Sequence, residues 1–320
     1  MKAIVYRGYG SPDVLRCEDI EKPTPRDNEV LIKVRAASVN PLDRHIMRGG
    51  PPFLRIAFGL RKPRVRPGRD VAGHVEAIGK RVTQFKPGDD VFGACSGALA
   101  EYACTRESAL VLKPGSITFE QAAAVPVAGL TALQGLRDKG KIRPLQKVLI
   151  NGASGGVGTF AVQIAKAFGA EVTAVCSARN AEMVRSIGAD RVMDYTIEDF
   201  SDGKQKYDLI FDLVATRSLR AYGRALNPNG TCVIGGGPTR VGAIVSTAFK
   251  VLVLSRFVSQ SFIMFVAKLS KEDLTVLREL MEAKKVTPVI DRRYKLSEAA
   301  DAIRYLEEGH ARGKIVVTVD

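Results

Sequence analysis

The chain has 320 residues, a length that corresponds to about two ordinary domains. Hydrophobic residues make up 46% and charged residues 26% of it, a balance that excludes a disordered or collagen-like protein. The formal net charge of +14 favours anionic partners: a phosphorylated cofactor, nucleic acid or an acidic membrane surface.

The N-terminal sequence MKAIVYRGYG lacks the apolar run of a signal peptide. The longest uncharged part of the apolar stretch 243–267 is 257–267, well below the roughly 20 residues of a membrane span. We therefore expect a surface or interface helix there. The five cysteines are scattered without a CxxC motif, which predicts a reduced, cytoplasmic protein without a disulfide framework or zinc ribbon.

The first 115 residues predict short strands separated by turns. Residues 30–34, 71–79 and 90–93 have strand character, and a KPGD turn at 86–89 precedes the last of them. This spacing indicates a compact, mostly β domain.

The pattern changes near residue 118, where Thr118 and Gln121 form a predicted capping box. Strands and helices then alternate, which is typical of a doubly wound parallel sheet. The strands are 147–150, 172–176, 191–193, 207–213 and 231–235, and the helices are 156–168, 180–187 and 218–226. Two amphipathic helices follow near 270–283 and 297–307. We expect the final strand, 314–319, to add to an existing sheet, with that of the first domain as the candidate.

A glycine-rich turn connects the strand at 147–150 to the helix at 156–168. The spacing Ala153-x-Gly155-x-x-Gly158 is the dinucleotide-binding fingerprint with alanine at its first position. Gly155 lets the backbone approach a pyrophosphate, and Gly158 lets the helix pack closely on the strand. A tight turn without a ligand is the alternative, but the flanking strand and helix favour a cofactor site.

The end of the next strand indicates which cofactor binds. An NAD site places Asp or Glu there, against the ribose 2′-hydroxyl. Here the strand ends at Cys176 and is followed by Ser177 and Arg179, whose hydroxyl and guanidinium suit a 2′-phosphate. Tyr195 lies just after the following strand and can also reach that phosphate. The sequence therefore predicts NADPH, with an ordinary solvated Arg179 as the alternative.

Several motifs together resemble the medium-chain dehydrogenase/reductase family, in its zinc-independent quinone oxidoreductase branch, which includes zeta-crystallin-like proteins. The resemblance covers nearly the whole chain. It rests on NPLD at 40–43, PGRDVAG at 67–73, AGLTA at 128–132, the loop 151–158 and HARGK at 310–314. It implies an α/β protein with a GroES-like β-rich catalytic domain (1–122 and 268–320) and a Rossmann NADP-binding domain (123–267). The implied reaction is hydride transfer from NADPH to a quinone or an activated alkene (enone).

The resemblance also indicates that metal ligands are missing. Zinc-dependent members have Cys where this chain has 39–41, His-Glu where it has Arg69-Asp70, and four cysteines near Cys95 and Cys104. The histidines His45, His74 and His310 are widely separated, and we expect His74 to be packed or hydrogen-bonded. We therefore expect no zinc.

The resemblance assigns candidate roles to individual residues. Asn40 faces the nicotinamide and substrate, and His45 takes the place of a tyrosine that lines the pocket in many relatives. His45 either shapes the pocket wall, or orients Asp43, or donates a proton or hydrogen bond to the developing enolate. The candidate cofactor-binding residues are Asn40, Thr131, Ala153, Ser154, Gly155, Gly156, Val157, Gly158, Ser177, Arg179, Tyr195, Val214, Gly235, Phe262 and Lys314.

The basic run at 61–69 is a solvated loop or a contact for RNA or membrane. It lacks interleaved aromatic residues, so we expect no nucleic-acid partner. The stretch 243–268 is a core segment or substrate flap, with a membrane-surface helix as the alternative. An NADPH-binding protein with vestigial activity, acting through RNA, membrane or protein partners, is the competing function. We also expect a homodimer.

Overall fold

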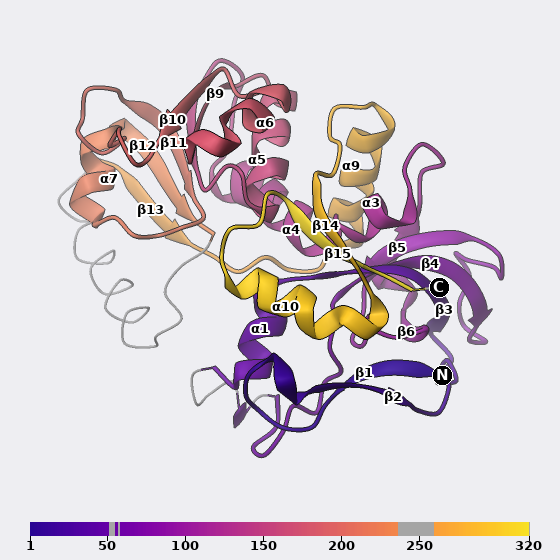
Figure 1. Ribbon diagram of the computed structural model, residues 1–320. Helices are drawn as coiled ribbons and strands as arrows, with labels where there is room; N and C mark the ends of the chain where they lie inside the picture. The colour runs from indigo at the N-terminus through magenta and orange to yellow at the C-terminus, as the bar shows by residue number, and fades with distance from the viewer. Residues whose placement is uncertain (51–54, 57, 236–258, 320) are drawn as a thin grey trace. The chain divides into compact units, whose positions relative to one another are not determined.

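The structure is a computed structural model that describes residues 1–319 except 51–54, 57 and 236–258 (Figure 1). The chain forms two compact units. The first comprises Met1–Leu130, Leu269–Lys284 and Pro288–Asp320, and the second comprises Thr131–Lys268 and Lys285–Thr287.

The first unit is built on a mostly antiparallel sheet. In its described part, seven strands have the order β14-β15-β3-β4-β5-β7, with β6 also paired to β3. The strands are β3 (Glu29–Val39), β4 (Asp70–Ile78), β5 (Asp90–Ala94), β6 (Tyr102–Arg106), β7 (Leu110–Leu112), β14 (Ile290–Lys295) and β15 (Lys314–Thr318). A separate hairpin joins β1 (Lys2–Tyr6) to β2 (Leu15–Asp19).

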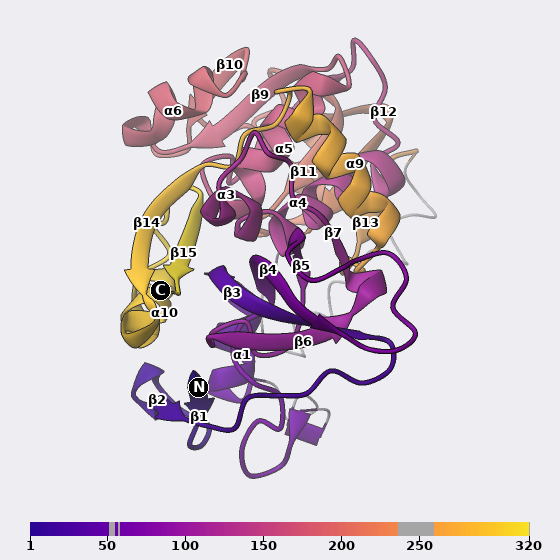
Figure 2. The same cartoon turned by 90° about the vertical axis from the view of Figure 1, so that its right-hand side faces the viewer.

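The C-terminal strand joins this sheet. β15 pairs antiparallel with β3, with Val317 opposite Ala37. The prediction that the last strand adds to the first domain's sheet is therefore confirmed. Helix α10 (Ala299–Glu307) packs on β14 and β15 (Figure 2), and other described helices of the unit include α1 (Pro41–Arg48), α3 (Phe119–Ala123) and α9 (Lys271–Glu282).

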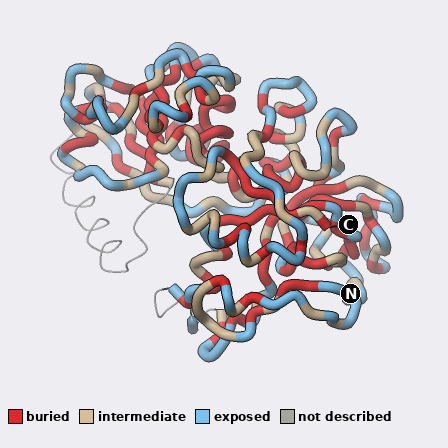
Figure 3. Tube along the Cα trace, viewed as in Figure 1, coloured by how far each residue is buried: buried red, intermediate tan, exposed pale blue. Residues whose placement is uncertain are grey.

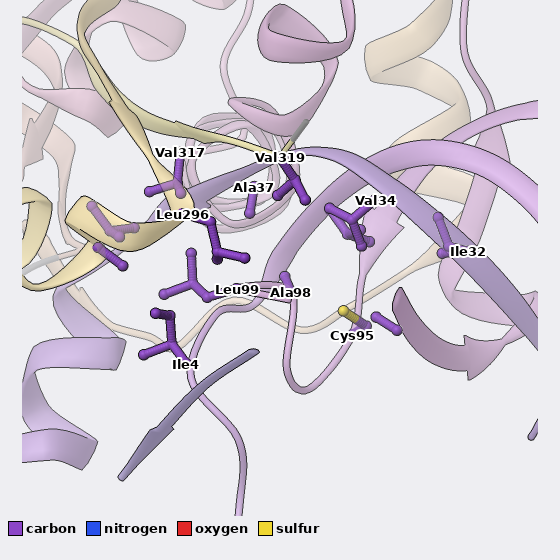
Figure 4. Close-up of a cluster of buried hydrophobic side chains, with 14 of the residues drawn as sticks. Ile4, Ile32, Val34, Ala37, Cys95, Ala98, Leu99, Leu296, Val317 and Val319 are labelled. Atoms are coloured by element: carbon purple, nitrogen blue, oxygen red, sulfur yellow. The ribbon is translucent and has the colours of Figure 1, made fainter. Parts of the chain in front are cut away.

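Buried and exposed residues alternate along β3, and the buried ones form part of the core of the first unit. Ile32 and Val34 are buried, whereas the intervening Lys33 and the following Arg35 are exposed. Figure 4 shows Ile32 and Val34 in a cluster with residues from distant segments, among them Ile4, Leu99, Leu296 and Val317. Buried residues follow the strands of both units (Figure 3).

The second unit is an all-parallel sheet with the order β10-β9-β8-β11-β12-β13. The strands are β8 (Lys147–Asn151), β9 (Glu171–Cys176), β10 (Arg191–Asp194), β11 (Tyr207–Asp212), β12 (Leu226–Ile234) and β13 (Ser261–Met264). Its helices include α5 (Gly156–Ala167), α6 (Ala181–Ser186) and α7 (Leu219–Ala225), while α4 (Pro126–Leu133) leads into it. The predicted doubly wound sheet is confirmed.

The expectation of a helix across 243–267 is wrong for the part that the structure describes. Residues Ser261–Met264 form β13, and Phe262 lies opposite Cys232 of β12. A short apolar run with aromatic and β-branched residues fits a buried strand as well as a helix, so periodicity alone does not distinguish them. The remainder of this expectation, residues 236–258, lies outside the described residues.

Candidate active site

The glycine turn after β8 forms a phosphate-binding loop in the second unit. Gly152 adopts a left-handed φ of 82°, and a Cβ at Gly158 would lie 2.1 Å from the Gly152 carbonyl oxygen, so only glycine fits at 158. Gly155 is the N-cap of α5 and supplies no side-chain cap, which leaves the first N–H groups of this 12-residue helix available to an anion. A Cβ at Gly155 would meet nothing of the protein closer than 3.4 Å. The loop therefore fits a dinucleotide pyrophosphate.

Asp212 fixes the neighbouring turn, a role that the sequence analysis missed. Its buried carboxylate accepts hydrogen bonds from Asn151 Nδ2 (3.1 Å), Val214 N (2.7 Å), Ala215 N (2.8 Å) and the Tyr222 hydroxyl (2.5 Å). Burial and the adjacent carboxylate raise the pKa of Tyr222 above its usual range. The sequence does contain a feature that could have indicated this role: Asn151 and Asp212 are polar residues at the ends of two parallel strands.

Asn180 connects the phosphate loop to the predicted 2′-phosphate residues. It is 5% exposed, and its Nδ2 lies 3.0 Å from Ser154 Oγ and 3.2 Å from Ser177 Oγ. Its Oδ1 has no hydrogen-bond partner in the described part of the chain. Arg179 is exposed, and Tyr195 is 56% exposed, so both side chains are accessible to a ligand. The structure thus joins Ser154 and Ser177 through a residue that the sequence analysis did not select.

The remaining candidates of this unit have different surroundings. Val214 is 46% exposed beside the glycine turn, where a Cβ at Gly152 would lie 3.0 Å from its side chain. Gly235 N donates to the Asp212 carbonyl oxygen (3.0 Å). Thr131 is half-buried in α4. Phe262 is 7% exposed and packs in the hydrophobic core, which gives its ring a packing role.

In the first unit, Asn40 belongs to a buried polar network. Asn40 Nδ2 donates to Asp70 Oδ2 (2.9 Å), while Lys314 Nζ donates to Asn40 Oδ1 (2.6 Å) and lies 3.3 Å from Asp70 Oδ2. The Ser38 hydroxyl and Val127 N also donate to the Asp70 carboxylate, at 2.7 and 3.0 Å. Asn40 is 2%, Asp70 0% and Lys314 4% exposed. The network therefore holds the Asn40 carboxamide in one orientation, and Lys314 contributes by holding its oxygen.

Asp43 sits at the start of α1, one turn from Asn40. Its carboxylate accepts from Asn40 N (2.9 Å) and Gly68 N (3.2 Å). Complete burial outweighs these two donors and raises the pKa of Asp43 to about 6. Because these backbone groups occupy the carboxylate, the structure gives no support to the idea that Asp43 orients His45.

His45 lies half-buried in α1. Burial, and next the charge of Arg44, lower the pKa of His45 and so favour the neutral form of its imidazole. His74 is packed and hydrogen-bonded as predicted, with Nδ1 2.7 Å from Asp90 Oδ1 and its ring edge-on to Phe119 at 4.8 Å.

The described residues contain no cluster of three His, Cys, Asp or Glu side chains that could hold a metal ion. All five cysteines are free thiols. No helix in the described ranges is long and apolar enough to cross a membrane.

A Rossmann sheet with a phosphate loop, together with a mostly antiparallel β unit, is the combination found in two-domain dinucleotide-dependent oxidoreductases. Family comparison matches residues 26–115 to the alcohol dehydrogenase GroES-like domain and residues 187–317 to the zinc-binding dehydrogenase domain.

Full-length relatives agree with these domain matches. A chloroplastic quinone-oxidoreductase homolog of Spinacia oleracea is 36% identical, over 99% of this chain and 98% of its own length. The NADPH-dependent alkenal/one oxidoreductase, chloroplastic, of Arabidopsis thaliana is 37% identical, over 99% and 79%. The quinone oxidoreductase structure from Coxiella burnetii superimposes with a TM-score of 0.86 at 32% identity, over 100% and 99%. The chain belongs to the medium-chain dehydrogenase/reductase family, in its quinone oxidoreductase branch. It is therefore an oxidoreductase, and the predicted GroES-like and Rossmann fold is confirmed.

Proposed function

We propose that the protein is an NADPH-dependent reductase that transfers hydride to quinones or enones without a metal ion. The observation that carries this proposal is the end of β9, where Ser177 and Arg179 follow the strand and no acid is present. The printed names of the relatives, a quinone oxidoreductase homolog and an NADPH-dependent alkenal/one oxidoreductase, support the same class of reaction.

Cofactor preference tests the role of Arg179. Losing one charge-assisted hydrogen bond to the 2′-phosphate costs about 1.5–3 kcal/mol, a tenfold or greater loss of affinity. Arg179→Ala should therefore weaken NADPH binding and leave NADH binding nearly unchanged. Arg185→Ala removes the same charge from an exposed position of α6 and serves as the control. Equal affinity of the wild type for NADPH and NADH would refute the proposal.

The proposed reaction leaves negative charge on the acceptor oxygen, and NADPH, when bound, supplies the hydride. Hydrogen-bond donors stabilise such a charge. The Asn40 amide already gives one N–H to Asp70, and its other contact, to the Ser38 carbonyl oxygen, is long at 3.5 Å. This second N–H is the group of Asn40 available to hold substrate or nicotinamide.

His45 is proposed as the donor in the same reaction, giving a hydrogen bond from its neutral imidazole or a proton from its protonated form. If it donates to the developing enolate, His45→Phe should lower kcat about 100-fold or more and remove the pH–rate limb of the imidazole. An unchanged kcat and pH profile, with only a small change in KM, would show that His45 shapes the pocket wall and that solvent supplies the proton.

Metal independence is tested separately. Purified protein should hold far less than one equivalent of zinc, and chelators should leave the activity unchanged. A stoichiometric metal whose removal abolishes activity would overturn this part of the proposal.

An NADPH-binding protein with vestigial activity remains the competing function, favoured by the basic run at 61–69. NADPH oxidation measured with a panel of quinones and enones separates the two, because the competing function predicts binding without turnover. A homodimer and a cytoplasmic location remain predictions, and the two plant relatives named above are described as chloroplastic.

A further inference from the structure

The Lys and Arg residues of one segment of the first unit have no role in the proposed reaction. From Arg44 to Arg69 the chain has eight Lys and Arg residues and no Asp or Glu. We define the basic tip as the exposed side chains that the structure describes in its central part. These are Arg55, Ile56, Leu60, Arg61, Lys62, Arg64 and Arg66.

The basic tip rests on an anchored backbone. Phe58 and Val65 pack against the core of the first unit, and Pro63 is buried. The Tyr9 hydroxyl donates to the Gly59 carbonyl oxygen, and Arg64 N donates to the Phe58 carbonyl oxygen (2.6 Å). These contacts fix the backbone of the loop against the first unit, while its charged side chains are exposed to solvent.

The charges of the basic tip are not neutralised within the described chain. Arg44 and Arg48, which precede it, both pair with Glu307. By contrast, Arg61, Lys62 and Arg64 have no carboxylate of the described residues within ion-pair distance. A surface with several uncompensated cations attracts an anionic partner.

Exposed aliphatic side chains lie between these cations. Ile56 is 75% and Leu60 72% exposed. Aliphatic side chains gain free energy where lipid headgroups meet acyl chains, while neighbouring cations bind the anionic headgroups. Nucleic acid would instead favour exposed aromatic rings, and the described aromatic residue of this loop, Phe58, packs against the core.

We propose that the basic tip docks the protein on an anionic lipid surface, with Leu60 and Ile56 entering the interface and Arg61, Lys62 and Arg64 binding headgroups. This inference does not depend on the proposed reaction. Such docking would bring the enzyme to a phase in which apolar quinones and enones concentrate.

The test is sedimentation of the full-length protein with vesicles of phosphatidylcholine, with and without phosphatidylglycerol. We expect binding only to the anionic vesicles, weakened by salt because ionic contacts are screened. Arg61→Gln/Lys62→Gln should lower the partition coefficient about 25-fold, at about fivefold per cation. Lys284→Gln/Lys285→Gln makes the same charge change at two other exposed lysines and should leave binding nearly unchanged.

Leu60→Ser separates interfacial insertion from charge attraction. It should weaken binding several-fold without changing the net charge. Turnover of a water-soluble enone should be the same in all of these variants, which shows that each is folded. Equal losses in the two double variants would attribute binding to net charge and overturn the proposal. A failure to bind anionic vesicles would also overturn the proposal, as would binding to a short RNA instead of the vesicles.

Discussion

Burial of Asp43 makes the stability of the first unit depend on pH. Its carboxyl group is 1% exposed, and its pKa is raised from 3.8 to about 6 because burial outweighs the two N–H donors. A raised pKa means that folding favours the protonated form. The resulting stability is present below about pH 4 and is lost as the pH rises through about 6. The gap between the two pKa values corresponds to about 3 kcal/mol.

Asp43→Asn removes this titration while retaining a side chain of similar size. We expect the unfolding free energy of the wild type, minus that of the variant, to fall by about 2–3 kcal/mol between about pH 4 and pH 7. Urea unfolding at several pH values measures it, with the exposed Asp19→Asn as a control that should give a flat difference above about pH 5. Two outcomes would contradict this reasoning. A difference that does not change with pH would show that the N–H donors of Asn40 and Gly68 offset burial, and a difference that grows with pH would show that they outweigh it.

Three further predictions test the Asp70 network, the contacts of Asp212 and the phosphate loop. Lys314→Met should cost about 3–5 kcal/mol because it leaves a buried carboxylate without its cation. Lys113→Met should cost less, since the carboxylate near that lysine is 39% exposed, and equal losses would contradict the reasoning. Tyr222→Phe should cost about 1–3 kcal/mol by leaving an oxygen of Asp212 without its donor, and an unchanged urea midpoint would argue against that contact. Gly158→Ala should abolish the thermal stabilisation given by NADPH, and a retained shift would show that the loop tolerates a Cβ.

Local sequence signals predicted much of the fold. The glycine turn and the alternation of strands and helices predicted a helix over 156–168, and α5 runs from Gly156 to Ala167. The capping box predicted at Thr118 and Gln121 is present at the start of α3. These features depend on neighbouring residues, so a single sequence contains the information that they need.

The site depends on contacts that local patterns do not encode. Lys314 and Asn40 are 274 residues apart, and no periodicity indicates that they meet. The resemblance includes Lys314 among the candidate cofactor-binding residues, and in the structure its ammonium group donates to Asn40 and Asp70. The sequence did not indicate a role for Asn180 either, because an asparagine before a short helix is an ordinary cap. Its two serine partners come from different loops, so no local pattern links the three residues.

The pairing of β15 with β3 has a consequence for synthesis on the ribosome. The second unit occupies one nearly continuous segment, so its six strands have all been made before β15 emerges. Until then, the C-terminal part of β3, Ala36–Val39, lacks its β15 neighbour, although β6 already pairs with Glu29–Lys33, and Asp70 lacks the cation that Lys314 later provides. The sheet of the nascent first unit is therefore incomplete, with part of one strand edge open and a buried carboxylate uncompensated, until β15 has been synthesised.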